Sequence, residues 1–430
     1  MFHKDSFISN AAAKLFVVYW IVLVVKCVLR SDVCGALPYE SFEISDWLIN
    51  YEGGFVRRGL DGQLLYWLYQ AQPFAPVHMV QFLVAMESVL FLGLLLYVFR
   101  KEGWSLAILP FGCCLYFTFL QTGQRRDMFM LIGAYLIFWC YNRYLSARRM
   151  GGGKLYLLPL ALLSAVVILS HEATFFFCFP IMMVYGCIVM RKEKKQWHKI
   201  FCSLAIPFLP ALITMSLVCF FKGDEATANA IWQSWDDAFR NYPDGLNDYQ
   251  HTAGNIGYGV GALAWKTMTT VRFHLSLNLF HGTPIRALTA QDYAVFPLLV
   301  WLFVATFYMV THINSIKIAA YRLAGAPQAT RIMSVLLLQF VFMLPMFTVL
   351  SCDYGRTIPY WVFSSLFALH VFGDLEWHPV ERIAAKATHA MSGPLLSSAA
   401  FFLAVSLLIP FVPAWGPRLS SLMPLRMLGL

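Results

Sequence analysis

Charged residues are scarce in this chain of 430 residues. Asp, Glu, Lys and Arg together make up 13% of it, whereas 59% of the residues are hydrophobic. Ordinary soluble domains carry about 25% charged residues, because a folded surface in water is largely polar. The scarcity of charge therefore excludes an ordinary soluble domain and makes the lipid bilayer the expected solvent of most of the chain.

Several chemical signatures are also missing. The glycine-rich stretch Gly53–Gly62 has neither the Walker nor the Rossmann spacing, so we expect no bound nucleotide. The ten cysteines show no metal-ligand spacing, and we expect neither a metal nor another cofactor. Cys34 and Cys352 alone fall clearly on the outer side, where they could form a disulfide if that side is oxidising. No basic patch is interleaved with aromatic residues, so the net charge of +9 does not indicate nucleic acid.

Long apolar runs are what the chain has in quantity. Runs of about 17–22 residues recur, each long enough as a helix to cross a hydrocarbon core about 30 Å thick. Helices are expected because lipid offers no partners for open backbone groups. We predict an all-α polytopic membrane protein of about eleven transmembrane helices, at about 14–30, 78–99, 104–122, 128–145, 155–170, 173–190, 200–221, 294–312, 333–351, 358–372 and 394–413.

Lysine and arginine set the expected orientation, because short loops rich in these residues stay in the cytoplasm. The basic connections near residues 100, 143–154, 191–199, 317–331 and 373–393 all fall on the side of the N-terminus. The N-terminus is then inside, the C-terminus outside, and the protein a multi-pass protein of the cytoplasmic (inner) membrane. Residues 1–430 are expected to form a single integral membrane domain.

Two long segments are expected on the outer side, at about 31–77 and 222–293. Loops of this length are usually functional or carry structure of their own. The second segment contains Trp232 and Trp235 among carboxylates and amides, a combination that suits sugar rings. The alternative is that these tryptophans belong to an aromatic belt at the membrane interface.

Charge nevertheless occurs at the outer ends of the predicted spans, against the general pattern. Four clusters from distant parts of the chain converge on this level: Arg57 and Arg58 within Gly53–Gly62, Arg125 with Arg126, His171 with Glu172, and Asp353 with Arg356. Ionisable groups at such positions are costly and tend to be functional. The convergence predicts one active or binding face.

Paired guanidinium groups match the oxygens of a phosphate or pyrophosphate. We expect phosphate to be held by the arginines Arg57, Arg58, Arg125, Arg126 and Arg356, and the proton acceptor to come from His171, Glu172, Asp46 or Asp353. Each cluster has an alternative interpretation. Arg125 and Arg126 can extend to lipid headgroups, Arg57 and Arg58 can pair with Glu52 and Asp61, Asp353 can pair with Arg356, and His171–Glu172 can be a polar junction between helices.

One stretch resembles a known family. The run Gln121–Asp127 (QTGQRRD), then a span, a basic turn and a second span ending in Leu169–Ala173 (LSHEA), resembles the polysaccharide polymerases that include EpsG and the Wzy-type O-antigen and capsule polymerases. The match covers about 60 residues. It implies transfer of an oligosaccharide from undecaprenyl pyrophosphate to a second lipid-linked unit at the outer face, with Arg125 or Arg126 on the pyrophosphate and His171 in the catalytic pocket. Other polysaccharide assembly proteins are then candidate partners. Glu172 after the histidine, and Arg-Arg-Asp where Arg-Gln is commoner, leave the base open.

Two other functions fit parts of the sequence. The chain is also similar to the broader GT-C glycosyltransferases, which use polyprenyl-phosphate sugars and commonly need an acidic residue in the first outer loop, a place that Asp46 or Glu52 fills. A transporter or flippase of lipid-linked saccharide is the alternative from another class. Transporters often contain broken helices, and five prolines interrupt the predicted spans, namely Pro110, Pro159, Pro180, Pro207 and Pro210.

Overall fold

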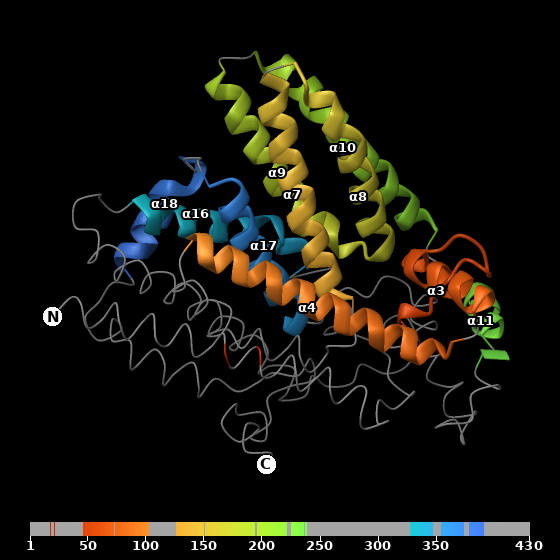
Figure 1. The fold of residues 1–430 in the computed structure, drawn as a ribbon. Helices are drawn as coiled ribbons and strands as arrows, with labels where there is room; N and C mark the ends of the chain where they lie inside the picture. Colours follow the sequence, from red (N-terminus) through yellow and green to blue (C-terminus); the bar gives the residue numbers. More distant parts are fainter. Residues whose placement is uncertain are drawn as a thin grey trace, which may run out of the picture. The chain divides into compact units, whose positions relative to one another are not determined.

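The computed structural model describes residues 46–72, 74–102, 126–149, 151–193, 196–221, 225–235, 237–238, 327–346, 354–373 and 378–390, together with residues 18 and 21. The predicted spans at 104–122, 294–312 and 394–413 lie outside the described residues, as do Cys34, Cys352 and all of the span at 14–30 except residues 18 and 21. Figure 1 shows the described elements in colour.

Regular structure in the described part of the chain is entirely helical, without strands. Three helical segments are long and apolar enough to cross a membrane: His78–Glu102, Gly153–Ser170 and Ala173–Lys192. They coincide with the spans predicted at 78–99, 155–170 and 173–190. The expectation of a helical protein is therefore confirmed for the described residues, and three of the helices are candidate membrane spans.

Four further described helices also fall at predicted spans. Helix α7 (Asp127–Arg149) covers the span predicted at 128–145, but it is not among the three candidates. Asn142 and Arg143 lie within it, and such residues lower its hydropathy. Helix α10 (Trp197–Phe220) contains the shorter apolar segment Leu204–Phe220, and α16 (Pro327–Phe342) and α17 (Tyr354–Val371) occupy the predicted spans near 333–351 and 358–372.

The chain divides into two compact units. Unit 1 comprises Met1–Val22, Leu95–Gln121 and Met268–Leu430, and unit 2 comprises Leu23–Leu94 and Thr122–Thr267. Helix α4 (Pro76–Glu102) begins in unit 2 and ends in unit 1. The prediction of a single membrane domain stays a prediction.

Helices α7, α8 (Leu157–Ser170), α9 (Ala173–Lys192) and α10 form a bundle in unit 2 (Figure 1). Small residues allow the helices to approach closely, as is common in membrane bundles. A Cβ atom on Gly133 would lie 2.5 Å from Val167, and one on Gly186 would lie 2.1 Å from the Tyr141 hydroxyl. The short turn between α8 and α9, at His171 and Glu172, is held at one end of this bundle.

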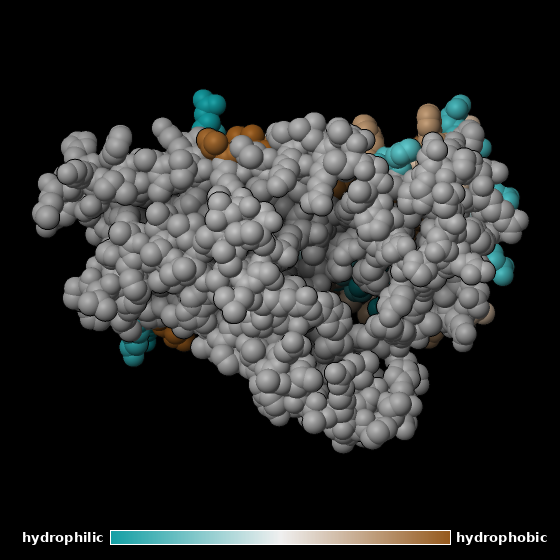
Figure 2. Space-filling view, turned by 90° about the horizontal axis from the view of Figure 1, so that it is seen from below, coloured by the Kyte–Doolittle hydropathy of each residue, from teal (hydrophilic) through white to brown (hydrophobic). Residues whose placement is uncertain are grey.

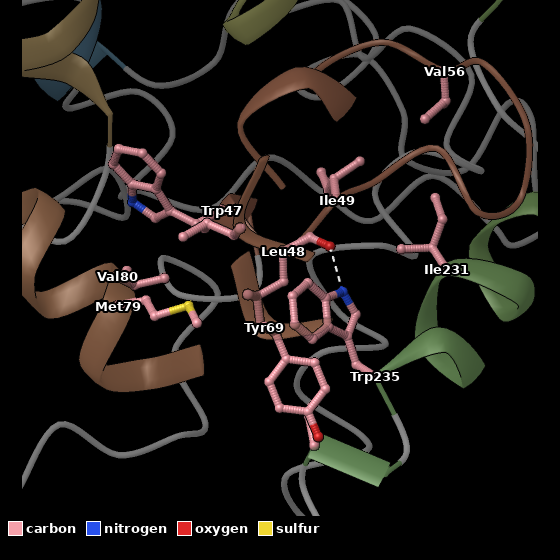
Figure 3. Packing of buried hydrophobic residues seen from close by; sticks show 11 residues of the cluster. Trp47, Leu48, Ile49, Val56, Tyr69, Met79, Val80, Ile231 and Trp235 are labelled. Carbon is pink, nitrogen blue, oxygen red and sulfur yellow. Dashed lines mark hydrogen bonds between the residues drawn. The ribbon is translucent and has the colours of Figure 1, made fainter. Parts of the chain in front are cut away.

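A second cluster of unit 2 joins the two long segments that were predicted to lie outside the membrane. Helix α3 (Gly59–Ala71), the loop before it and α11 (Glu225–Ser234) surround a core of buried apolar residues. Trp235 donates a 2.8 Å hydrogen bond to the Leu48 carbonyl (Figure 3). Asn50 donates another of 2.8 Å to Ser234. The first outer segment is therefore folded against the second.

In unit 1, α16 packs against α17 and against α18 (His378–Ala390). Trp361 donates a 2.8 Å hydrogen bond to the Leu336 carbonyl, and Gln339 donates one of 2.7 Å to Ser364. His370 at the end of α17 lies 2.8 Å from Glu102 at the end of α4. Polar side chains thus join helices inside an apolar unit, where each buried polar group needs a partner.

Apolar side chains are exposed along the helices of the bundle. Leu158, Leu162 and Val166 are exposed on α8, and Ile206, Leu209 and Ile213 on α10. On the face drawn in Figure 2, hydrophobic and hydrophilic side chains of the described residues both reach the surface. Exposed apolar rows of this length are expected where helices contact lipid.

Candidate active site

Six charged side chains of unit 2 meet where α3 and the start of α7 reach the α8–α9 turn. We define this charge cluster as the arginines Arg57, Arg58 and Arg126 and the carboxylates Asp46, Asp61 and Glu172. Their sequence positions span 46 to 172, and the ion pairs between them join four separate segments. The cluster thus sets three arginines against three carboxyl groups.

Arg126 forms the inner layer of the cluster and is fully buried. Its guanidinium lies 2.8 Å from an oxygen of Asp61 and 3.4 Å from one of Asp46. It also donates hydrogen bonds to the backbone carbonyls of Asp46, Arg58 and Ser170, and the Trp47 ring packs 5.5 Å from it. These contacts tie the loop before α3 to the end of α8, and the guanidinium has no exposed surface.

Arg58 and Glu172 form the outer layer. Arg58 binds both carboxylate oxygens of Glu172, at 2.6 and 3.0 Å, a two-point geometry that is among the strongest for an ion pair. Arg57 approaches the same carboxylate at 3.6 Å. The side chains of Arg57, Arg58 and Glu172 are 16%, 18% and 19% exposed, whereas Arg126 has no exposed surface. A ligand can therefore reach the outer layer and not the inner one.

The backbone that presents Arg58 is unusual. Arg58 has a φ of +62°, in the left-handed region that residues with a side chain seldom adopt. It occupies the N-cap of α3, directly before the first helical residue. Such conformations cost about 1–3 kcal/mol and persist where surrounding contacts fix them. Here the Arg58 carbonyl is held by Arg126 at 3.1 Å and the side chain by Glu172.

Burial and charge act in opposite directions on the two most informative carboxyl groups. Burial by itself would raise the pKa of Glu172, but Arg58, together with His171 and Arg57, holds that pKa well below its usual range. Burial raises the pKa of Asp61, and the nearby Arg126 and the Ser170 hydroxyl offset this only in part. Burial also lowers the pKa of Arg57. Glu172 is thus the firmly ionised member of the pair.

His171 is the C-cap of α8, and its Nδ1 accepts a 3.2 Å hydrogen bond from the Ala173 backbone N–H. The role of proton acceptor that we expected for His171 stays a prediction. Its Nδ1 lies 3.8 Å from Glu172, so His171 belongs to the surroundings of the cluster.

An aromatic group borders the outer layer. Tyr51 stacks on Phe55, and Phe55 packs edge to face against Phe221 at the end of α10, with 5.3 Å between ring centroids in each pair. The Arg57 backbone N–H donates a 3.1 Å hydrogen bond to the Phe221 carbonyl. Phe55 and Phe221 are exposed. We call Tyr51, Phe55 and Phe221 the aromatic rim; it places apolar faces beside the reachable arginines.

Other predicted site residues lie elsewhere or outside the described part. Trp235 is buried in the core of Figure 3, so it supports the loop at Leu48 and offers no face to a sugar. Trp232 lies in α11 and Arg356 in α17 of unit 1, but their side chains are outside the described residues, as are Arg125 and Asp353 entirely. Within the described residues, no group of three or more His, Cys, Asp or Glu side chains could hold a metal.

Asp61 and Ser170 are site residues that sequence reasoning did not single out. Ser170 donates a 2.8 Å hydrogen bond to Asp61, which also binds Arg126. Asp61 was considered only as a partner for Arg57 or Arg58, the arginines nearest in sequence. The signal that could have identified it is its place in the first turn of α3 between Gly59 and Gly62, where both glycines face tightly packed neighbours.

Comparisons with known proteins do not assign the chain to a family. No family model, no curated protein and no solved structure matches it. The function therefore has to be argued from the geometry of the charge cluster.

Proposed function

We propose that this protein is a glycosyltransferase of the cytoplasmic membrane that acts on polyprenyl-(pyro)phosphate-linked saccharides at the extracytoplasmic face, as a polymerase in surface polysaccharide biosynthesis. The observation that carries the proposal is the outer layer of the charge cluster. It offers two reachable arginines and a carboxylate beside exposed aromatic rings, in a protein with membrane-spanning helices.

Arg57 and Arg58 are the candidate ligands of the donor phosphate. Two neighbouring guanidinium groups neutralise the charge that develops on a departing phosphate. Arg126 acts as a positioning residue, since it holds the Arg58 backbone and Asp46 without reaching the surface. The aromatic rim offers apolar faces to sugar rings or to the first isoprene units of the lipid.

Glu172 is the candidate proton acceptor, because it is the most exposed carboxylate of the cluster. The acceptor hydroxyl attacks the anomeric carbon while its proton passes to Glu172. The bond between that carbon and the phosphate oxygen breaks, and the polyprenyl (pyro)phosphate leaves with both electrons of the bond. No nucleotide takes part in this reaction.

The proposed topology is that of the sequence prediction, with about eleven spans, the N-terminus inside and the C-terminus outside. It is supported by the packing of the loop before α3 against α11, because these segments were predicted to lie on the same side. The prolines give less support to a transporter. Pro180 lies inside α9, and Pro207 and Pro210 lie inside α10, and both helices continue through them.

Sugar transfer by the full-length protein in lipid nanodiscs tests the proposal. The donor and acceptor are lipid-linked oligosaccharides, and the product is measured as glycan of higher mass. We expect Arg58→Ala to lower the rate by about 100-fold or more, as is typical for loss of a group that stabilises developing charge. The matched control is Arg149→Ala, which removes an arginine at the opposite end of α7 from Arg126, where its partner Glu193 lies 2.8 Å away.

Three outcomes separate the alternatives. Elongation of an oligosaccharide donor supports the polymerase. Transfer only from a polyprenyl-phosphate monosaccharide would identify a GT-C type transferase instead. If labelled saccharide crosses the membrane of sealed vesicles and no glycosidic bond forms, the protein is a transporter and the proposal is wrong.

A further inference from the structure

The two layers of the charge cluster differ in what a ligand can displace. Arg126, Asp46 and Asp61 are enclosed, and exchanging their partners would leave buried charges unpaired. The outer pair of Arg58 and Glu172 is partly exposed, and Arg57 lies beside it. Glu172 presents two oxygens to Arg58 in the geometry that a phosphate would use. The carboxylate therefore occupies the position of an anionic ligand.

We propose that Glu172 is an internal substitute for the phosphate of the substrate: it occupies Arg57 and Arg58 in the ligand-free protein and is released when an anionic headgroup takes its place. The inference rests on the proposed function for the identity of that headgroup. The exchange itself is a property of the binding site and can be tested without any transfer reaction.

The charges of the cluster favour such an exchange. A phosphate that entered without displacing Glu172 would bring its negative charge next to an ionised carboxylate that already binds the two arginines, and uncompensated charge in a partly buried site is costly. Release of Glu172 frees the two guanidinium groups that the phosphate needs.

The exchange also links binding to pH. Glu172 is faced by Arg58 and Arg57 from the loop before α3 and by His171 from the end of α8, and Asp46 and Cys219 lie near the two arginines. In the ligand-free state the arginines hold the pKa of Glu172 well below its usual range. A bound phosphate would take the arginines away from Glu172 and add negative charge beside it, so the pKa of Glu172 rises in the complex. At a pH between the pKa of Glu172 without phosphate and its pKa with phosphate, binding takes up a proton.

The released carboxylate is also a better proton acceptor than the paired one. General-base efficiency increases as the pKa of the base approaches the working pH. Substrate binding would therefore raise the reactivity of Glu172 at the moment when the acceptor hydroxyl has to lose its proton. The same exchange leaves Glu172 unreactive in the absence of donor, because Arg58 then binds both its oxygens.

Binding of geranyl pyrophosphate, a short soluble prenyl pyrophosphate, tests the exchange by isothermal titration calorimetry on the full-length protein in nanodiscs. Glu172→Gln removes the competing charge and keeps the side-chain shape. We expect it to bind the probe on the order of tenfold more tightly than the wild type, within the usual range of coupling between two ligands. Glu193→Gln, the same change in the pair with Arg149, should leave the affinity unchanged.

Proton uptake on binding the probe provides a second readout. Heats measured in two buffers of different ionisation enthalpy give the number of protons bound with the probe between about pH 5 and pH 7.5. The phosphate groups titrate alike in both proteins, so the difference between wild type and Glu172→Gln isolates Glu172. We expect wild-type affinity to rise more steeply than that of the variant as the pH falls.

The inference is overturned if Glu172→Gln binds the probe no more tightly than the wild type, if both show the same pH dependence, or if neither binds. If Glu172→Gln does not fold, wild-type proton uptake no larger than that of the phosphate alone overturns it. Exchange without sugar transfer would retain this inference and remove the proposed function. Sugar transfer that depends on Arg58, without exchange of Glu172, would support the proposed function and overturn this inference.

Discussion

Arg126 shows how burial decides the role of a charged residue. Its position at the outer end of a predicted span suggested a phosphate ligand, but its guanidinium is enclosed by two carboxylates and three carbonyls. An arginine with these partners joins segments of the chain. The residues that remain available to a ligand are Arg57 and Arg58, one layer further out.

Arg126→Ala should destabilise the protein strongly. The substitution leaves Asp46 and Asp61 in a buried site without their main cation, and breaking a buried ion pair costs about 3–5 kcal/mol. Thermal unfolding in detergent, followed by tryptophan fluorescence, measures the effect. Arg149→Ala is the control, because its pair with Glu193 is largely exposed and such pairs contribute about 0–1 kcal/mol. Equal shifts for the two variants would contradict the structural role of Arg126.

Glu172 gives an expectation for acid stability. Its pKa is lower in the folded protein than in the unfolded chain. Its contribution to stability is therefore fully present above the unfolded value of about 4.3 and is lost as the pH falls through the folded value. Asp61 acts with the opposite sign, because its pKa is raised by burial, and folding gains as it takes up a proton.

The difference in unfolding midpoint between wild type and Glu172→Gln isolates this contribution, since Asp61 is common to both. We expect the wild type to be the more stable above about pH 5 and its advantage to shrink below about pH 4. A difference that stays constant or widens on acidification would show that the Arg58–Glu172 pair does not stabilise the fold.

At the scale of elements, the loop before α3 packs closely against the helix because two glycines there have no side chain. A Cβ atom on Gly62 would lie 2.0 Å from the Ile49 carbonyl oxygen, and one on Gly59 would lie 2.2 Å from the Tyr51 ring. A ring can rotate, whereas a backbone carbonyl cannot move alone. The two glycines therefore differ in how well they tolerate substitution.

Gly62→Ala should cost about 1–3 kcal/mol of stability and displace α3 with Asp61, as is usual when atoms are forced into a packed site. Gly59→Ala should cost less. Gly93→Ala in α4 is the control, because its Cβ would meet no atom within 4 Å and alanine favours a helix by about 1 kcal/mol. Unfolding midpoints of the three variants in detergent test the order, and a Gly62→Ala protein as stable as Gly93→Ala would contradict the packing.

For the whole molecule, the expected orientation places the two ends of the unit 2 bundle on opposite sides of the membrane. Gln72 at the end of α3 and Lys154 between α7 and α8 are both exposed. In a cysteine-free background we expect Gln72→Cys to react with a membrane-impermeant maleimide on intact cells, and Lys154→Cys to react only after the membrane is opened. Labelling of both on intact cells would refute the proposed topology.

Sequence reasoning was most successful where one physical rule dominates. Apolar length identified the spans at 78–99, 155–170 and 173–190, because hydrophobicity and the need for internal hydrogen bonds leave the backbone little choice in lipid. It also selected Arg57, Arg58, Arg126, His171 and Glu172, which the fold brings together. Sequence reasoning did not predict which of these residues form ion pairs with each other, because pairing across more than 100 residues depends on how the helices pack.

The sequence by itself determined that this is a helical membrane protein with charge concentrated at the ends of certain spans, since composition and periodicity act locally along the chain. Only the tertiary structure decided which charges are sealed and which are reachable. Arg126 is buried because α3, α7 and α8 close around it, and Arg58 stays accessible because its left-handed backbone directs it to Glu172 at the α8–α9 turn. Burial and pairing are properties of the packed elements, and no local pattern encodes them.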